Sequence, residues 1–304
     1  MFDYAALNAL AAVVREGSFE RAARALNVTP SAVSQRVKAL EERVGGALLV
    51  RAQPCVATEA GLQLCRHIER VGMLEHELRD ALPALGMGGG EASERVTVRV
   101  AVNADSLATW FIAAAAAFAT QEEGALLDLT VDDQDHTAER LRSGAVLAAV
   151  TALAQPVAGC NSEPLGTTHY VAAASPGFVK RHFGKKGVGA RTLANAPSLV
   201  FDRKDRLQAR WVRRICHRNV ETPRHWVPSP TAFVEAACAG MGWGMHPASM
   251  VADALREGRL VELVPGSTLP VPLYWQQARA APRLLRTLGE AVRAAATSGP
   301  HALA

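Results

Sequence analysis

The sequence predicts an α/β protein that begins with a smaller all-helical unit. Apolar residues recur at helical spacing over residues 4–44, whereas short β-branched runs alternate with helical stretches over residues 96–276. A polar, Gly-rich segment, residues 86–94, separates the two patterns and predicts a flexible linker. With 304 residues, 49% of them hydrophobic, the chain can bury the cores of more than one domain.

The first unit is expected to start with three helices, over residues 4–16, over residues 19–26 and from Pro30 onward. Thr29 is a suitable N-cap for the third helix. Pro30 fits the first helical position because the N–H that proline lacks would be unpaired there in any case. The short sequence "NVT" separates the second helix from the third. Two short helices, a tight turn and a longer helix indicate a helix-turn-helix.

Two stripes run along the third helix. The apolar stripe, which predicts the face that packs on the core, comprises Val33, Val37, Leu40 and Val44. The polar stripe on the nearly opposite face comprises Ser31, Ser34, Gln35 and Lys38. The polar stripe is rich in hydrogen-bonding groups and free of acidic residues, which is unusual for a helix face that is merely solvated.

The helix-turn-helix is followed by a predicted hairpin and a long helix. Residues 47–61 read as a small hairpin, or wing, with Arg51 near its tip. The next helix, over about residues 59–82, carries an apolar stripe of Leu64, Ile68, Val71, Leu78 and Leu82. Its alternating steps of four and three suit a helix–helix dimer seam. The alternative is that this stripe packs on its own domain.

Beyond the linker, short strands alternate with helices. The expected strands are residues 96–102, 126–131, 147–152, 169–174, 198–201, 224–227, 260–263 and 272–276. This alternation predicts right-handed βαβ crossovers and open parallel sheets.

Polar segments follow several of these strands and predict a small-ligand cleft. "NADS" (103–106) follows the first strand, "DDQDHT" (132–137) the second, and "SPTAF" (229–233) opens a helix after a later one. Ligands of open α/β sheets bind outside the carboxyl ends of the strands. Each segment alone fits simple helix capping, whereas together they indicate a cleft.

Several other classes of protein are not supported. Histidines and cysteines do not fall into metal-ligand spacing, and neither a P-loop nor a G-x-S-x-G elbow occurs, so we expect no metal, no cofactor and no enzyme. The five scattered cysteines and the lack of a signal-peptide pattern predict a reduced cytoplasmic protein. The apolar segment 110–119 is too short to span a bilayer.

The segment "FERAARALNVTPSAVSQRVKALEERVGGALLVR" resembles the DNA-binding domain of LysR-type transcriptional regulators. The segments "AVNADSLATWF", "DDQDHTAERLRSGAV" and "YWQQ" are similar to the ArgP/LysG-like branch of that family, which senses basic amino acids and controls arginine or lysine export. The resemblance covers nearly the whole chain. It implies a winged helix-turn-helix, a dimerising linker helix and a periplasmic-binding-protein-like effector domain of two doubly wound α/β subdomains.

The resemblance also implies a division of the chain. The expected parts are a winged helix-turn-helix domain (1–58), a linker or dimerisation helix (59–85), a flexible hinge (86–94) and an effector domain (95–304). Within the effector domain, subdomain I is expected at about 95–162 with 268–304, and subdomain II at about 163–267.

Site residues follow from the same resemblance. The expected DNA contacts are Thr29, Pro30, Ser31, Ser34, Gln35, Lys38 and Arg51. The expected effector contacts are Asn103, Asp105, Ser106, Asp133, Asp135, Thr151, Asp202 and Ser229. Among these, Asp105 would receive the α-ammonium of an amino acid, and Asp133, Asp135 or Asp202 would pair with a cationic side chain.

The function implied is a transcriptional regulator that senses L-lysine or L-arginine and controls transcription of a basic amino acid exporter gene. Its expected partners are promoter or operator DNA, the effector, further copies of the chain as a homodimer or homotetramer, and RNA polymerase, but no membrane. The rival interpretation is a nucleoid or replication-origin protein that binds DNA without an effector.

Overall fold

The amino-terminal helices begin at the caps that the sequence supplies. In the computed structural model, which describes residues 3–82, 95–132 and 137–304, the side chains of Asp3, Ser18 and Thr29 each accept a hydrogen bond from a backbone N–H of the helix that follows. The three helices are α1 (Tyr4–Glu16), α2 (Phe19–Ala25) and α3 (Pro30–Val44). The predicted helix-turn-helix is confirmed.

The core of this unit forms where the helices and a small hairpin meet. Val33, Val37 and Leu40 of α3 are buried as expected. Val44 is 41% exposed, so its assignment to the core was wrong: it is the last residue of α3, beyond the part that the other helices cover. The predicted wing is an antiparallel pair of strands, β1 (Leu49–Val50) and β2 (Val56–Ala57).

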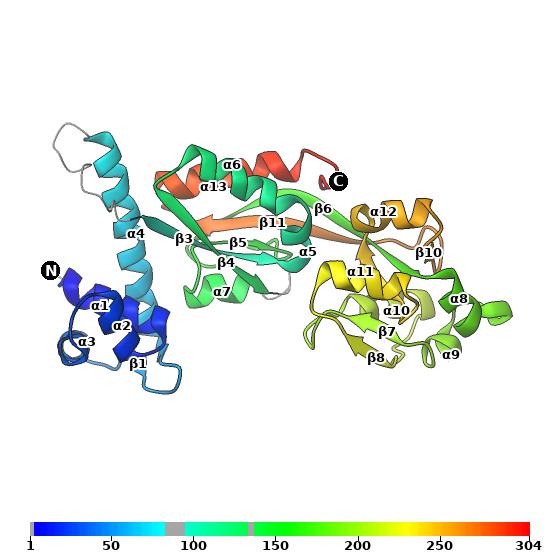
Figure 1. Ribbon diagram of the computed structural model, residues 1–304, viewed down its shortest axis with the longest axis horizontal. Coiled ribbons are helices and arrows are strands. Elements are labelled where there is room, and N and C mark those ends of the chain that lie inside the picture. Colours follow the sequence, from blue (N-terminus) through cyan, green and yellow to red (C-terminus); the bar gives the residue numbers. More distant parts are fainter. Residues whose placement is uncertain (1–2, 83–94, 133–136) are drawn as a thin grey trace.

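Helix α4 (Glu59–Ala81) runs from the first unit past one end of the larger α/β unit (Figure 1). The first part of its apolar stripe, Leu64, Ile68 and Val71, packs on the amino-terminal core, as the alternative interpretation expected. The second part, Leu78 and Leu82, is exposed, and so is Leu74, which was not part of the predicted stripe. A dimer seam therefore has only the second part available. The hinge at 86–94 lies outside the described residues.

The larger unit is built on one mixed sheet, with strand order β10-β6-β11-β5-β3-β4 and with β9 beside β6. Its strands are β3 (Val96–Asn103), β4 (Ala125–Asp132), β5 (Ala148–Thr151), β6 (Cys160–Ala174), β9 (Gly244–Pro247), β10 (Val261–Glu262) and β11 (Leu269–Ala278). A separate parallel pair consists of β7 (Ser198–Val200) and β8 (Arg224–Trp226).

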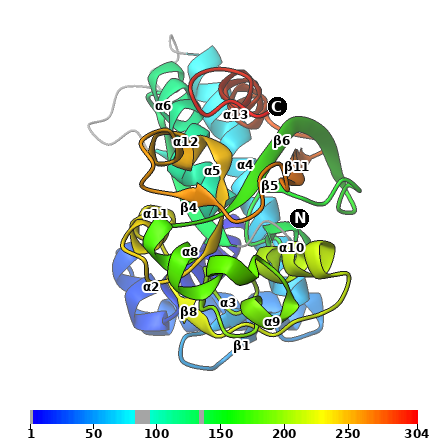
Figure 2. The same cartoon turned by 90° about the vertical axis from the view of Figure 1, so that its right-hand side faces the viewer.

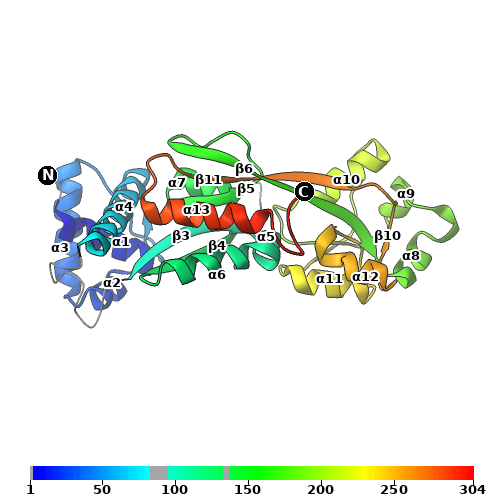
Figure 3. The ribbon, with the colours of Figure 1, turned by 90° about the horizontal axis from the view of Figure 1, so that it is seen from above.

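The expectation of open parallel sheets was wrong for the sheet as a whole, which is mixed. Strands β3, β4 and β5 pair in parallel, but β6 and β11 pair antiparallel with each other. The physical reason is that these two long strands carry the chain from the first half of the unit to the second and back, in opposite directions (Figures 1 and 3). We propose that the halves divide near residues 163 and 268, beside this crossing.

Helices cover the sheet on both faces. In the first half, α6 (Ile112–Gln121) and α13 (Arg283–Ala296) pack together on one face, and α7 (Thr137–Ser143) lies on the other (Figure 1). The second half faces the viewer in Figure 2. Its helices are α8 (Pro176–His182), α9 (Ala190–Leu193), α10 (Leu207–Cys216), α11 (Pro230–Cys238) and α12 (Ala248–Arg256). In the described part of the chain, no helix has both the length and the apolar character needed to cross a membrane.

Candidate functional site

The outer face of α3 carries the polar stripe. Ser31, Gln35 and Lys38 are exposed and Ser34 is partly exposed, because the opposite face of the helix is buried in the core. The Thr29 hydroxyl accepts a hydrogen bond of 3.2 Å from the Ala32 N–H and lies 3.0 Å from the Ser31 hydroxyl. The stripe therefore presents polar side chains and one cation to solvent. Side chains of these kinds can hydrogen-bond to base edges and contact phosphates.

Arg51 lies at the start of the wing turn, directly after β1, rather than at its tip. Its guanidinium lies over the Phe19 ring, 5.5 Å from the centroid, and 3.9 Å from a Glu41 carboxylate oxygen. More than half of its side chain remains exposed. These contacts hold the cation beside α2 and α3, on the unit that carries the polar stripe.

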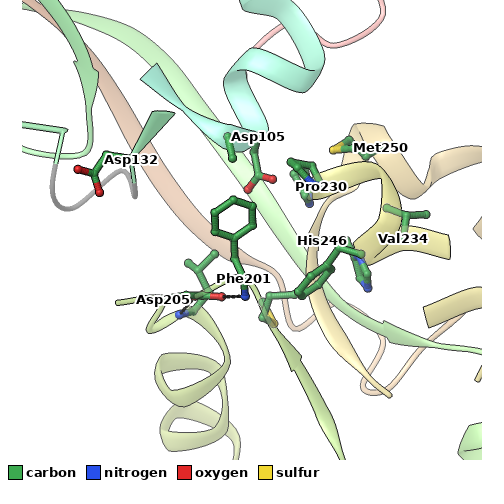
Figure 4. A pocket seen from close by; sticks show the side chains of 13 residues that line it. Asp105, Asp132, Phe201, Asp205, Pro230, Val234, His246 and Met250 are labelled. Carbon is green, nitrogen blue, oxygen red and sulfur yellow. Dashed lines mark hydrogen bonds between the residues drawn. The ribbon is translucent and has the colours of Figure 1, made fainter. Parts of the chain in front are cut away.

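A pocket lies between the two halves of the α/β unit (Figure 4). The first half contributes Ala104, Asp105 and Asp132. The second half contributes Phe201, Asp205, Leu207, Pro230, Phe233, Val234, Met245, His246, Pro247 and Met250. The described lining thus holds three carboxylates and neither lysine nor arginine.

Asp105 enters the pocket from the first helical turn after β3. This turn, α5 (Ala104–Ser106), continues through a π-helical turn into α6. The Tyr170 hydroxyl on β6 donates a hydrogen bond of 2.6 Å to Asp105 Oδ2. In Figure 4, Asp105 and Phe201 point toward each other across the pocket. The carboxylate is therefore held in place by a strand that belongs to both halves.

Asp205 enters the pocket from the loop after β7. Its carboxylate accepts hydrogen bonds from the backbone N–H groups of Phe201, at 3.0 Å, and of Leu207, at 2.9 Å. Burial raises the pKa of Asp205 above its usual value, and these two N–H donors oppose that change. A cation beside it would favour the ionised form, so this carboxylate is suited to a positively charged ligand.

Asp132 ends strand β4 and lies at the opposite end of the pocket from Val234, His246 and Met250 (Figure 4). Its side chain is only 8% exposed. Arg140 Nε lies 3.1 Å from one of its oxygens and Lys204 Nζ lies 2.9 Å from the other. Two cations therefore already neutralise this carboxylate.

His246 lies on the largely apolar wall of the pocket. Its ring is edge-on to Phe233, with the centroids 5.2 Å apart. Burial lowers the pKa of His246 to about 4, so the imidazole is neutral near pH 7 and does not repel a cation in the pocket.

The structure brings some of the expected effector residues together and leaves others apart. Asp105 lines the pocket, whereas Asn103, which precedes its turn, and Ser106, which ends it, are absent from the described lining. The buried side-chain oxygens of Asn103 and Ser106 have no hydrogen-bond partner among the described residues, so a ligand near this turn could satisfy them. Asp133 and Asp135 lie outside the described residues.

The remaining three expected residues serve local structure. Asp202 accepts hydrogen bonds from the Lys204 and Asp205 N–H groups, which fixes its own turn. Ser229 caps α11, and the buried Thr151 hydroxyl accepts a hydrogen bond from the Leu153 N–H. None of the three is in the described lining of the pocket. The carboxylate that this loop contributes to the lining is Asp205, not Asp202.

Sequence reasoning missed Asp132, Asp205 and Tyr170. Asp132 belongs to the same segment as Asp133 and Asp135, which lie outside the described residues, and Asp205 follows Asp202 by three positions in one loop. The position of each loop after a strand indicated that Asp132 and Asp205 lie near the cleft. The backbone turn that directs one aspartate of a loop into the pocket leaves no sequence pattern. Tyr170 lies within an expected strand, where a tyrosine is ordinary.

Chemically, this pocket suits a small cation with an apolar stem. Asp105 and Asp205 can pair with positive charge, and Phe201 offers a ring face on which a guanidinium or an alkyl chain can pack. In the described part of the chain, no group of three or more His, Cys, Asp or Glu side chains could hold a metal ion.

Comparisons with known proteins agree with this arrangement. Residues 4–62 match the family model for bacterial regulatory helix-turn-helix proteins of the lysR family, and residues 91–297 match the LysR substrate binding domain. The chain is 46% identical to the HTH-type transcriptional regulator ArgP of Pseudomonas aeruginosa over 98% of its own length and 97% of that protein.

Two solved structures are similar over nearly the whole chain. The crystal structure of ArgP from Mycobacterium tuberculosis is 43% identical, with a TM-score of 0.80 and complete coverage of both chains. Full-length LysG from Corynebacterium glutamicum, solved with bound effector Arg, is 37% identical, with a TM-score of 0.73 over 97% of this chain and 98% of that one.

Proposed function

The chain belongs to the LysR family of bacterial helix-turn-helix regulatory proteins, and on that premise we propose that it is a DNA-binding transcriptional regulator whose effector is L-arginine or L-lysine. The observation that carries this proposal is the acidic pocket between the two halves of the α/β unit. Its described lining contains Asp105, Asp132 and Asp205, and the one histidine there is neutral. The arginine bound to the related LysG supports the same ligand class.

Within the pocket, the two ends of the ligand use different contacts. Asp105, held by Tyr170, receives the α-ammonium. The α-carboxylate lies near the start of the helical segment 104–121, where backbone N–H groups and the helix dipole attract negative charge. The cationic side chain extends past Phe201 toward Asp205 and Asp132. A ligand that contacts both halves would couple binding to closure of the cleft.

DNA binding is assigned to α3 and the wing. Ser31, Ser34, Gln35 and Lys38 face the major groove, while Thr29 and Pro30 at the helix start lie near a phosphate. Arg51 contacts the backbone or the minor groove from the start of the wing turn. The structural support is that α3 exposes this stripe while its other face is buried.

Assembly and cellular context complete the proposal. Leu74 and Leu78 of α4 and Leu82 directly after it are exposed and apolar, which supports a contact between two copies in a homodimer, and two dimers would give a tetramer. The protein acts in the cytoplasm, beside RNA polymerase, at the promoter of a basic amino acid exporter gene.

Selection of genomic DNA fragments by the purified protein tests this function. Fragments that remain bound are sequenced from parallel reactions with no ligand, with arginine and with lysine. We expect a few strong sites, one of them at an exporter promoter, and a basic amino acid should change their occupancy or footprint. Broad binding that neither amino acid alters would favour the effector-independent DNA-binding protein instead.

A further inference from the structure

A lysine from the second half of the α/β unit reaches across the cleft to a carboxylate of the first half. Lys204 Nζ donates a hydrogen bond of 2.9 Å to Asp132 Oδ1, while Arg140 Nε donates one of 3.1 Å to Oδ2. Asp132 ends β4 and Lys204 lies in the loop after β7, so their ion pair joins the two halves.

The two partners differ in burial. The Asp132 side chain is 8% exposed and lines the pocket, whereas the Lys204 side chain is 48% exposed and is absent from the described lining. Because the carboxylate is already buried, it needs cations beside it, whereas the half-exposed ammonium can return to water at little cost. Of this pair, Lys204 is the partner that can be exchanged.

We propose that Lys204 is an internal competitor of the effector, whose ammonium occupies Asp132 in the ligand-free protein and is displaced by the cationic end of a basic amino acid. This inference rests on the proposed function. The Lys204 ammonium has the same chemistry as the side-chain cation of lysine, so the two compete for one carboxylate oxygen. Arg140, on α7 of the same half as Asp132, stays in place.

This competition has two consequences for recognition. It lowers the affinity for every cationic ligand, because each must first displace Lys204. It also disfavours ligands with neutral side chains, because they cannot replace the ammonium at Asp132, and a buried carboxylate that loses a cation without gaining another is costly. Lys204 is therefore a specificity-determining residue of the site.

Calorimetric titration of full-length wild-type protein and the Lys204→Gln variant with arginine, lysine and citrulline tests this inference. Citrulline is the probe for a neutral side chain of nearly the same shape as arginine. We expect arginine and lysine to bind Lys204→Gln about two- to tenfold more tightly than wild type, the range expected for a half-exposed ion pair plus relief of cation–cation repulsion. The affinity for citrulline should increase less than the affinities for arginine and lysine.

Two further variants separate this mechanism from simpler effects. Lys204→Arg keeps the cation and should retain an affinity close to that of wild type. Lys185→Gln removes an exposed cation from the same half, away from the described lining, and should leave all three affinities unchanged. The gain in Lys204→Gln should shrink at high ionic strength, because salt screens a half-exposed pair.

The possible results distinguish this inference from the proposed function. If wild type binds arginine or lysine and Lys204→Gln binds them equally or more weakly, Lys204 is a ligand contact or a bystander and the competitor model is wrong, while the proposed function stands. If Lys204→Gln alone binds them, competition is stronger than expected. If neither protein binds a basic amino acid, the proposed function fails and this inference fails with it.

Discussion

The Tyr170 hydroxyl lies 2.6 Å from Asp105 Oδ2 and joins two parts of the chain that are far apart in sequence. Tyr170 belongs to β6, the strand that passes from one half of the α/β unit to the other, and Asp105 belongs to the first helical turn after β3. This hydrogen bond fixes the direction of a carboxylate that lines the pocket. A movement of β6 would therefore shift the Asp105 carboxylate at the proposed α-ammonium site.

The variant Tyr170→Phe should lower the affinities for arginine and for lysine by a similar factor, about three- to tenfold. The ring is kept, but one charge-assisted hydrogen bond to Asp105 is lost. Calorimetry measures both affinities. Tyr274→Phe is the matched control, because Tyr274 is outside the described lining of the pocket. If Tyr170→Phe binds both amino acids as wild type does, Asp105 does not hold the α-ammonium in the way proposed.

The polar stripe of α3 gives a second prediction. Gln35→Ala should relax the base preference, because an amide that reads a base edge is lost. Lys38→Ala should lower the affinity for all DNA sites. If Lys38 contacts a phosphate, this variant should also reduce by about one the slope of log affinity against log salt concentration. Fluorescence anisotropy with specific and scrambled DNA at several salt concentrations measures both effects. Gln63→Ala, at an exposed position of α4, is the control. Unchanged affinity and selectivity in both stripe variants would contradict the assignment.

The exposed end of the α4 stripe gives a third prediction. Leu78 is 53% exposed, so Leu78→Glu costs little in a monomer but places a carboxylate inside the proposed contact between two copies. Sedimentation of the full-length protein should show a shift toward monomer. Met241→Glu replaces an exposed apolar residue of the second half and should leave the assembly intact. An unaltered dimer in Leu78→Glu would move the interface elsewhere.

The fourth prediction concerns stability at acidic pH. The folded-state pKa of His246 is about 4 and its ordinary value is 6.5, so the unfolded chain binds more protons between these values and acid favours unfolding. Urea denaturation at about pH 7 and about pH 5 should show that His246 accounts for a loss of about 2 kcal/mol of unfolding free energy.

Replacement of His246 should remove that part of the pH dependence. His246→Leu should lose less stability on acidification than wild type does, even if it is less stable at both pH values. His169→Leu, at an exposed position, measures the effect of losing another histidine. Equal losses in wild type and His246→Leu would show that His246 is protonated as easily in the folded state as in the unfolded state.

The amino-terminal unit could be predicted from the sequence because its signals are local. The caps at Ser18 and Thr29 and the left-handed glycines Gly17 and Gly45 fix where the helices begin and end. Val44 was misplaced because periodicity alone does not tell where along a helix the neighbouring elements stop.

The first part of β6 could not be predicted because its signals are distant. Residues 160–168 contain Pro164 and Gly166 among polar residues, which is typical of a loop. They form a strand because they pair with β11, more than a hundred positions later, with a register shift between Leu273 and Tyr274. A contact of that range is invisible to a local pattern.

For the ligand site, the strand series located the cleft, but not every side chain in it. Asp105 was found because it opens a helix directly after a strand. Asp202 was expected because it follows a strand, but its side chain closes the turn in which Asp205 lies, and Asp205 is the residue of this loop that lines the pocket.

The most direct test of the account is a calorimetric titration of wild type, Asp105→Asn and Asp205→Asn with arginine and citrulline. Each variant keeps the shape of the side chain and removes one negative charge from the pocket. Loss of one partner of a desolvated charge pair costs about 2–5 kcal/mol, so we expect wild type to bind arginine much more tightly than citrulline and each variant to lose at least about tenfold in affinity for arginine. Asp205→Asn should narrow the preference for arginine over citrulline, because it acts on the side-chain end. Equal binding of arginine and citrulline by wild type would contradict the claim that this cleft recognises a basic amino acid.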